Sequence, residues 1–477
     1  MYQRQYKFSL SLDLDKNKIF LINRGDLKDR IDPLYNKYIL QFKLNEIETI
    51  KLNDVLFDNP MYGANESSIE FNNFCRYIRI TDIDEFGLLK KDGIRSAEKE
   101  ELKYKVHLND ILFARSGATV GKAYIHLDSS LNAIFAGYLI RFRVNESLLL
   151  SKFLFYFTQT TIYKEWVNAI QRTAGQPNIN AEEYKSLLIP NLKLGIQQNI
   201  IDMMDKAYES KKQKEKEAQG LLDNIDDYLF DKLGIKLPVK PENNIENITF
   251  KVGFDDIFGD RLDADSYTSY YQNIFDTFEK STCKFTTLKT ITKKIKTGTT
   301  PDQKLDAFTI EKEIVFLRNS DIQDGEIIED KFKYIKNNLE KYLTFSYKNE
   351  IIICIAGTIG ISALNRFDRL AINQNVSSLT IDETQININF LISWLNTRVA
   401  ISLLKRLASI ATIAYVNNPT LLRLQIPLPA ITIQNKIVDE IKRRKQKAKQ
   451  LQEEAKLELE NAKKEVERII LGNNYEC

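Results

Sequence analysis

Histidine and cysteine, the residues that most often bind metals or act as nucleophiles, are sparse in this chain. Its two histidines, His107 and His126, do not belong to a cluster with ligand-like spacing, which argues against a zinc site or histidine-based catalysis. The four cysteines form neither a C-x-x-C motif nor a disulfide framework: Cys75, Cys283, Cys354 and Cys477. We therefore expect unpaired thiols in a reducing compartment.

The segment Gly117–Lys122 comes nearest to a phosphate-binding loop. Three residues separate its glycines where a P-loop has four, and Ala123 stands where the Mg²⁺-binding Ser or Thr would be. We therefore predict a tight turn between two strands. Its exposed N–H groups could still approach a phosphate, because glycine turns form good anion nests.

Two acidic residues, Asp110 and Glu350, stand at matching places in similar segments of the chain. Nuclease sites of the PD-(D/E)xK kind need an E-x-K pattern, and neither residue is followed by one. We interpret both as structural carboxylates at a strand edge or turn. The sequence thus completes no hydrolytic or nucleotide-binding motif.

The elements that hold these residues come in two copies of one pattern. Residues 179–204 and 416–441 align without a gap, and eight of the 26 positions are identical where about two are expected by chance. The identical pairs are Asn180/Asn417, Leu187/Leu424, Ile189/Ile426, Pro190/Pro427, Ile196/Ile433, Gln197/Gln434, Ile200/Ile437 and Asp202/Asp439.

Three further pairs of segments occur in the same order in both copies. They are Arg30-Ile31-Asp32 and Arg261-Leu262-Asp263, each followed by a tyrosine (Tyr35, Tyr267); Tyr77–Ile83 and Phe316–Ile322; and Asn109–Phe113 and Asn349–Ile353, each leading into a glycine pair (Gly117/Gly121, Gly357/Gly360). The offsets vary between 231 and 240, as loop insertions would cause. This shared order favours a duplication over chance similarity between unrelated strands.

Each copy is expected to be a mixed α+β domain. Short apolar runs between Gly, Asn and Asp residues predict strands, for example at 109–114, 137–144, 349–356 and 377–381. Helical stretches are interleaved with them at 147–167 and 387–407, which occupy the same place in each copy.

A long charged helix with an apolar seam follows each domain. The seam residues are Ile196, Ile200, Met203, Ala207, Leu221, Ile225 and Leu229 in the first helix, and Ile437, Ile441, Ala448, Leu451, Ala455, Leu459, Ala462, Val466 and Ile469 in the second. Polar residues at Ser210, Lys214 and Arg444 make the heptads imperfect. We predict that the two helices pair as an antiparallel coiled coil.

The predicted helices run from Ile196 to Leu233 and from Ile433 to Ile470. At the rise of an α-helix each would be roughly 57 Å long. Gly234 and Pro238 should end the first one, before a linker. The predicted boundaries are 1–190 for the first domain, 191–235 for its helix, 236–249 for the linker, 250–430 for the second domain and 431–471 for the second helix.

Composition limits the class of protein. The 477 residues are too many for one core, and 43% hydrophobic with 28% charged residues is an ordinary globular profile. No signal-peptide core and no apolar run of 18 residues occurs, so we expect a soluble, cytoplasmic protein without a membrane partner. A net charge of +3 means that contacts to a polyanion must be local or shared with a partner.

The chain resembles the specificity subunits of type I restriction–modification systems. The resemblance covers nearly the whole chain and rests on the duplicated order of its motifs: the R-(I/L)-D…Y opening, MYGANES (61–67), LNDILFARSGATVGK (108–122), TGTTP (297–301), NEIIICIAGTIG (349–360) and the exit into each helix. It implies two repeated target-recognition domains separated by the paired helices, each domain reading a few base pairs of double-stranded DNA.

The resemblance also implies partners that carry the chemistry. Methyltransferase subunits would dock on the helices and restriction subunits would join them, binding S-adenosylmethionine, ATP and Mg²⁺, with no cofactor in this chain. The chain has no G-x-G, and Asn417-Asn418-Pro419-Thr420 lacks the second Pro and the aromatic residue of an (N/D)PP(Y/F) tetrapeptide. We therefore expect a recognition subunit that is not itself an enzyme.

Candidate DNA contacts are polar side chains in the predicted loops, since Arg and Lys bind phosphates and Arg, Asn, Gln, Ser and Thr read base edges. In the first copy they are Arg79, Thr81, Arg115, Ser116, Lys122, Arg172 and Gln176. In the second copy they are Lys296, Thr299, Thr300, Arg318, Asn319, Gln374 and Asn375.

Arg79 and Arg318 are common to both copies, so a structural ion pair or a phosphate clamp is the alternative for them. Residues that differ between the copies, such as Arg115 and Ile355, are better candidates for base reading because two half-sites need not match. The basic run 442–447 is interpreted as a solvated or partner-facing helix surface.

Two other functions stay open at this point. One is the specificity subunit of a type IIB-like system, whose partner is a fused methyltransferase–nuclease. The other is a coiled-coil scaffold that binds only proteins, which the two polar-loop domains argue against.

Overall fold

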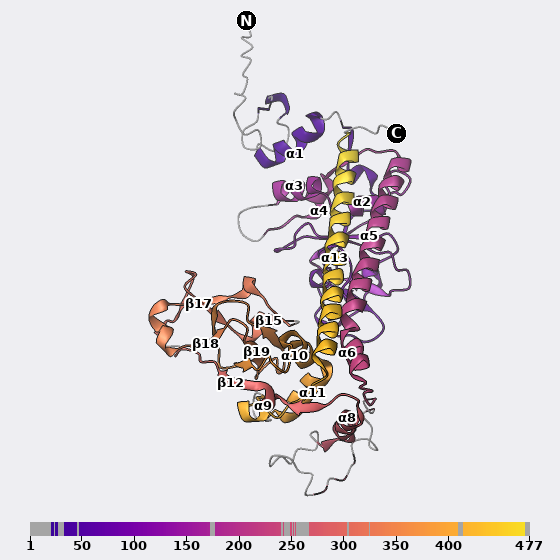
Figure 1. Ribbon diagram of the computed structural model, residues 1–477. Coiled ribbons are helices and arrows are strands. Elements are labelled where there is room, and N and C mark those ends of the chain that lie inside the picture. The colour runs from indigo at the N-terminus through magenta and orange to yellow at the C-terminus, as the bar shows by residue number, and fades with distance from the viewer. Residues whose placement is uncertain are drawn as a thin grey trace, which may run out of the picture. The chain divides into compact units, whose positions relative to one another are not determined.

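The computed structural model (Figure 1) describes residues 21–22, 24–26, 33–44, 47–171, 177–239, 242, 249, 251, 253, 267–302, 305–323, 325–408 and 414–472. They fall into two units, which we describe one at a time. The first unit takes residues up to 215 and those from 452, and the second takes residues 216–451.

The first unit mixes helices and short strands, as predicted for an α+β domain. Its strands are β1 (Thr49–Lys51), β2 (Met61–Tyr62), β3 (Ser68–Glu70), β4 (Arg76–Ile78), β5 (Arg95–Ala97), β6 (Ile111–Ala114), β7 (Ala123–Ile125), β8 (Ala133–Phe135), β9 (Leu139–Phe142) and β10 (Leu188–Pro190). Its helices before the long one are α1 (Pro33–Leu44), α2 (Ser151–Phe157), α3 (Thr161–Ile170) and α4 (Ala181–Lys185).

The second unit repeats this order of strands and helices and contains additional strands. Its strands are β11 (Phe285–Thr287), β12 (Thr292–Thr297), β13 (Phe308–Thr309), β14 (Ile314–Leu317), β15 (Ile322–Gln323), β16 (Glu326–Ile327), β17 (Lys333–Ile335), β18 (Thr344–Tyr347), β19 (Ile351–Cys354), β20 (Ser362–Leu364), β21 (Arg369–Ile372), β22 (Val376–Ile381) and β23 (Gln425–Pro427). Its shorter helices are α8 (Ser269–Lys280), α9 (Leu288–Ile291), α10 (Ile388–Leu395), α11 (Arg398–Leu407) and α12 (Asn418–Leu421).

Strand pairing confirms the duplication. The antiparallel sheet β2-β9-β6-β7 of the first unit corresponds to β12-β22-β19-β20 of the second. The parallel pair β4–β8 corresponds to β14–β21, and the antiparallel pair β1–β10 corresponds to β11–β23. In the second unit, β13, β17 and β18 enlarge the equivalent of the β4–β8 pair to five strands.

The largest core of each unit lies between its four-stranded sheet and the paired helices that follow it. In the first unit Phe113, Phe153 and Trp166 are fully buried there. In the second unit Phe390 and Trp394 have the same role. These helices are the 147–167 and 387–407 stretches that the sequence predicts, each split in two by a polar break.

The long helices are α5 (Leu194–Asp223), α6 (Ile225–Leu233) and α13 (Ile431–Ile470, 40 residues). The prediction of one continuous helix from Ile196 to Leu233 was wrong at one residue, Asn224. Asn224 leaves the helical conformation, and its Nδ2 donates to the Gly220 carbonyl at 2.7 Å. An Asn side chain that bonds nearby backbone competes with the helix, which then restarts at Ile225. Gly234, in the left-handed conformation, ends α6 as predicted.

Each unit contains part of an antiparallel helix pair. In the first unit, Ser210 Oγ donates to Glu458 at 2.6 Å and Lys214 pairs with Glu454 at 3.4 Å. Residue numbers rise along one helix while they fall along the other, so the two helices are antiparallel. In the second unit, Ala218 is buried with Ala448 and Leu451.

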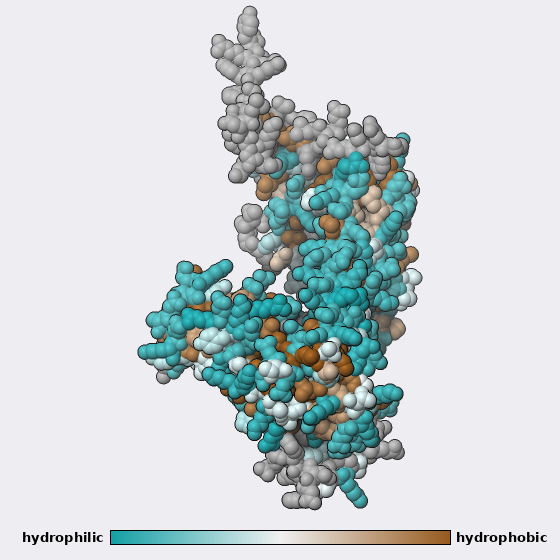
Figure 2. Space-filling view, viewed as in Figure 1, coloured by the Kyte–Doolittle hydropathy of each residue, from teal (hydrophilic) through white to brown (hydrophobic). Residues whose placement is uncertain are grey.

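The same direction holds further along the pair in the second unit, where Arg444 Nη1 donates to the Asn224 carbonyl at 3.1 Å. The visible face of α13 is mainly hydrophilic (Figure 2), as its charged composition requires. None of the helices in the described ranges combines the length and apolarity that a membrane crossing would need.

Candidate nucleic-acid interface

The turns after β4 and β14 are built identically around an arginine and an aspartate. Arg79 donates from Nε and Nη2 to Asp82 at 3.1 and 2.6 Å, and Arg318 does the same to Asp321 at 3.1 and 2.7 Å. Each carboxylate also accepts the backbone N–H of its arginine at 2.9 Å. These contacts support the structural ion-pair alternative for both arginines, and a DNA contact by either stays a prediction.

Cationic side chains gather at this turn in the first unit. Lys122 Nζ donates to the Ile83 carbonyl at 3.0 Å, and Lys90 Nζ donates to the Thr81 carbonyl at 2.9 Å. Burial lowers the pKa of Lys122, and the nearby charge of Lys90 lowers it further. Acidic side chains lie at the same turn: Asp82 pairs with Arg79, and the charges of Asp84 and Glu85 act to raise the pKa of Lys122. The turn therefore carries charges of both signs.

The Gly117–Gly121 segment is a turn between β6 and β7, as predicted. Gly117 has φ +81°, and its N–H donates to the Pro177 carbonyl at 3.1 Å. The N–H groups of Val120, Gly121 and Lys122 also donate to protein carbonyls at 2.9–3.1 Å. Because these donors are used within the fold, the turn closes a hairpin and does not resemble an anion nest.

Asp110 and Glu350 are structural carboxylates, as interpreted. Asp110 is 1% exposed and accepts from Arg143 Nε at 2.6 Å. Glu350 is 7% exposed and accepts from Ser378 Oγ at 2.7 Å, with Lys296 Nζ 3.0 Å away.

A cationic side chain lies near the buried carboxylate of each unit, Asp110 or Glu350. The sheet register explains why this side chain comes from a different strand in the two units. Met61 pairs with Arg141 in the first unit, and Lys296 pairs with Ser378 in the second. Lys296 therefore stands where the first unit has Met61, while Ser378 replaces Arg141. Lys296 is engaged inside its own unit, and its DNA contact stays a prediction.

At the other end of each four-stranded sheet, a set of loops meets in the same backbone framework. In the first unit, the N–H groups of Gly63, Ala64, Arg115 and Ile179 donate to the carbonyls of Leu139, Phe135, Tyr138 and Arg115. In the second unit, those of Gly298, Thr299, Ile355 and Val416 donate to the carbonyls of Val376, Ile372, Asn375 and Ile355. We call these loop sets the first rim and the second rim.

One glycine in each rim is required by close approach of the backbone. A Cβ on Gly63 would lie 2.3 Å from the Ala136 carbonyl oxygen, and one on Gly298 would lie 2.1 Å from that of Asn373. No side chain fits at such distances, so the two loops must cross here in both units.

The side chains on the two frameworks differ. In the first rim the Arg115 guanidinium lies over the Tyr62 ring, 4.9 Å from its centroid, and Tyr138 is 64% exposed. Ser116 bridges to Asn178, whose Oδ1 is buried without a hydrogen-bond partner among the described residues.

The second rim carries amides and hydroxyls. Thr300 Oγ1 bonds to Gln374, and Thr299 Oγ1 donates to the Tyr342 carbonyl at 2.9 Å. Asn319 lies over the second glycine turn, since a Cβ on Gly357 would be 2.8 Å from its Nδ2. Asn375 belongs to this rim through its carbonyl. Amide side chains of this kind can bind adenine edges.

Five predicted residues lie in the second rim: Thr299, Thr300, Asn319, Gln374 and Asn375. Two predicted residues, Arg115 and Ser116, lie in the first rim. Arg172 and Gln176 lie outside the described residues. Sequence reasoning missed Tyr62, Tyr138 and Asn178 as candidates. Only Tyr62 had a signal, because it precedes the glycine of the MYGANES segment.

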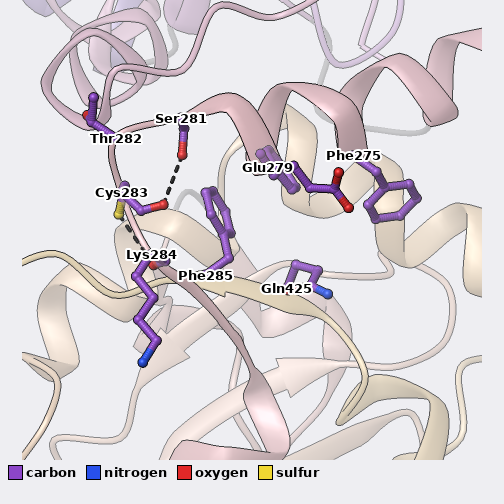
Figure 3. A pocket seen from close by; sticks show the side chains of 9 residues that line it. Phe275, Glu279, Ser281, Thr282, Cys283, Lys284, Phe285 and Gln425 are labelled. Atoms are coloured by element: carbon purple, nitrogen blue, oxygen red, sulfur yellow. Dashed lines mark hydrogen bonds between the residues drawn. The ribbon is translucent and has the colours of Figure 1, made fainter.

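A pocket of about 480 Å³ in the second unit, between α8 and β11, does not resemble a catalytic site (Figure 3). Ser281 Oγ donates to the Cys283 carbonyl at 2.9 Å, and burial raises the pKa of the Cys283 thiol. A hydroxyl that donates to a backbone carbonyl and a thiol kept protonated are poor nucleophiles. Within the described ranges, no three His, Cys, Asp or Glu side chains gather as a metal site requires.

Comparison with known proteins gives a family match over most of the chain. The model of the type I restriction modification DNA specificity domain matches residues 44–221 and again residues 280–461. No curated protein sequence matches the chain.

The fold is shared with a solved structure. A chain from a structure of the type I R-M system matches with a TM-score of 0.54 and 13% identity, over 89% of this chain and 96% of that one. The HsdS subunit from Thermoanaerobacter tengcongensis gives a TM-score of 0.42 at 12% identity, over 90% and 97%. The S subunit of the type I restriction-modification system from M. genitalium gives 0.40 at 13%, over 90% and 96%.

Proposed function

Because the chain belongs to the family of the type I restriction modification DNA specificity domain, we propose that it is the non-catalytic DNA-recognition subunit of a type I restriction–modification complex. Each unit reads one half of a bipartite target. Methyltransferase subunits dock on the long helices, and restriction subunits join them. S-adenosylmethionine, ATP and Mg²⁺ are bound by those partners.

The observation that carries this proposal is the pair of rims. Both use the same four backbone hydrogen bonds, yet Arg115 and Tyr138 in one correspond to Ile355 and Asn375 in the other. A protein that reads two different half-sites with one design needs that arrangement, because base edges are distinguished by the pattern of donors and acceptors.

Two lysines near the turn after β4 support the same proposal. Lys90 and Lys122 follow the turn after β4, and the Gly117–Gly121 hairpin that leads to Lys122 begins beside Arg115. Phosphate contacts fix the register of a protein on DNA, while side chains at a neighbouring edge read the bases. Lysines beside a varied polar rim would combine both tasks in one unit.

Exchange of the second unit tests this function. Residues 250–430 are replaced with the homologous segment of a subunit of known target, and methylated sites are mapped by sequencing the DNA of cells that carry the variant or the original chain. We expect one half of the target to change and the other to stay. A target that changes in both halves, or a strain whose methylation does not depend on the chain, would contradict the proposal.

The isolated chain provides a second test. It should bind DNA but transfer no methyl group and hydrolyse no ATP, because these reactions are assigned to the partners. Robust S-adenosylmethionine turnover by the purified chain would show that the chain itself catalyses a reaction that the proposal assigns to its partners.

A further inference from the structure

We propose that Arg115 reads a guanine in the half-site recognised by the first unit, and that the Tyr62 ring holds its guanidinium in the reading position. This inference rests on the proposed function and goes beyond it, because it names the base, the reader and a positioning residue.

Unlike Arg79 and Arg143, Arg115 has no anionic partner among the residues that the structure describes. Arg79 is paired with Asp82, and Arg143 is paired with Asp110 at 2.6 Å. Among the residues that the structure describes, no carboxylate or carbonyl accepts a hydrogen bond from the Arg115 side chain, and its Nε is buried without a partner. A guanidinium in this state can bind a ligand without first breaking an ion pair.

Both ends of the Arg115–Tyr62 pair are fixed by the fold. The Arg115 N–H donates to the Tyr138 carbonyl at 3.0 Å, and its carbonyl accepts from Ile179 N–H at 2.8 Å. Tyr62 pairs with Ile140 in the sheet, and its hydroxyl accepts from Ala181 N–H at 3.0 Å. Tyr62 is therefore fixed through both its backbone and its hydroxyl. The Arg115 guanidinium lies 4.9 Å from the centroid of this ring, and the contact restricts its rotation.

The chemistry of such a group selects guanine. A planar guanidinium presents two parallel N–H donors, and guanine is the base that offers two acceptors, O6 and N7, side by side in the major groove. Adenine places a donor at one of these positions, and thymine places a methyl group beside its single acceptor. A lysine could not reproduce the fork, because its ammonium is a single point charge.

The equivalent place in the second rim makes the inference specific to one half-site. Ile355 stands there and is fully buried, so it offers no polar group to DNA. Gln374 is exposed at that rim, next to Asn375. Changes at Arg115 or Tyr62 should therefore leave the second half-site unaffected.

The test measures base discrimination in the full chain assembled with its methyltransferase partner. The target is first mapped by methylome sequencing with the unchanged chain. Gel-shift titrations at fixed salt then compare this target with duplexes in which each guanine of either half is replaced in turn. For the unchanged chain, replacing the guanine read by Arg115 should weaken binding about tenfold to a hundredfold.

Arg115→Ala should weaken binding to the original target by a similar factor and abolish discrimination at that one guanine only. Arg115→Lys should lose most of the discrimination. Tyr62→Leu, which removes the ring, should reduce it, whereas Tyr62→Phe, which keeps the ring, should largely retain it. Gln374→Ala should alter the second half alone. Arg95→Ala is the matched control in the first unit, since its Nη2 has only a 3.4 Å contact to the Ser68 carbonyl.

Two results would overturn the inference while the proposed function stands: a bipartite target at which Arg115→Ala still distinguishes every guanine, or a loss of discrimination in the second half. Uniform weakening on all duplexes would also overturn it, because Arg115 would then be a phosphate contact. If Arg115→Ala does not fold, Arg115→Lys and Tyr62→Leu decide between the same outcomes. An unchanged complex without a bipartite target would instead refute the proposed function.

Discussion

Gln197 in α5 and Gln434 in α13 make the same three hydrogen bonds in their respective units. Gln197 Oε1 accepts from Leu150 N–H at 2.9 Å, and its Nε2 donates to the carbonyls of Leu148 and Leu192 at 3.1 and 2.8 Å. Gln434 bonds the N–H of Asn387 and the carbonyls of Gln385 and Pro429 at 2.7, 3.4 and 2.8 Å. Both side chains are at most 1% exposed, so each long helix is tied to its own domain by a buried amide.

Gln197→Ala should therefore destabilise the first unit by about 2–4 kcal/mol, because three backbone groups lose a buried partner. Urea unfolding of the full chain measures this as an earlier transition of one unit, and Gln434→Ala should shift the other. Gln198→Ala is the control, since Gln198 is exposed and bonds only Asp202 on the same helix. Equal effects of Gln197→Ala and Gln198→Ala would show that the buried amide does not join helix to domain.

The buried carboxylate of Glu350 should make the second unit sensitive to acid. Burial alone would raise its pKa, but hydrogen bonds from Ser378, Tyr347 N–H, Lys296 and Thr380 together lower it below the ordinary value of 4.5. A carboxyl with a lowered folded-state pKa stabilises the fold above its unfolded pKa, and this contribution is lost as the pH falls through the folded pKa.

Stability of the second unit should accordingly decrease below about pH 4.5, the range set by the unfolded glutamate. Glu350→Gln should lower stability at neutral pH and flatten the decrease in acid. Urea midpoints measured between neutral and acidic pH test this. A Glu350→Gln protein with the same acid dependence as the original would show that another group is responsible.

Phe86 links a loop of the first domain to both long helices of that unit. Its ring lies 4.1 Å from Lys211 Nζ and 5.9 Å from Lys463 Nζ. Asp84 Oδ1 accepts the Phe86 N–H at 2.8 Å and holds the loop. Phe86→Ala should destabilise the first unit by about 1–2 kcal/mol, since a half-buried ring and two cation–π contacts are lost.

Leu88→Ala is the matched control in the same loop, because Leu88 is 50% exposed. Urea unfolding should separate the two variants, and hydrogen exchange around Lys211 should become faster only in Phe86→Ala. No change in either measurement would mean that the ring does not hold the loop on the helices.

The helix pair should set the number of unread base pairs between the half-sites. Lys214 pairs with Glu454, so four residues inserted after Gln213 and four after Glu453 lengthen both helices at the same level. They add about 6 Å of helix, close to two base pairs at about 3.4 Å each. Methylome sequencing should then show both half-sites unchanged and the spacer longer by one or two base pairs. Four residues inserted after the 95% exposed Ile310 should leave the spacer as it was. An active double-insertion variant with the original spacer would contradict this role.

The sequence alone determined the duplication, the α+β character and the outer ends of the long helices to within a few residues. Asn180 and Asn417, identical in the two copies, show how local such signals are. Each caps a helix, accepting the N–H of Glu183 or Thr420 at 2.9 Å. Caps, apolar periodicity and turn glycines act over a few residues, so their signals survive in the linear order of the chain. The one error in the long helices, at Asn224, arose where a side-chain bond within one turn interrupted an otherwise continuous apolar seam.

Only the tertiary structure decided which polar residues are used inside the fold and which stay available. Lys296, a candidate for DNA contact, lies beside Glu350 because of the sheet register. Arg115 contacts the ring of Tyr62, which lies more than fifty positions earlier in the chain, because β2 places that ring against the guanidinium. The partner of a charged side chain is set by strand register and loop crossing between distant segments. Because these depend on the packing of the whole unit, no local pattern of residues carries the information.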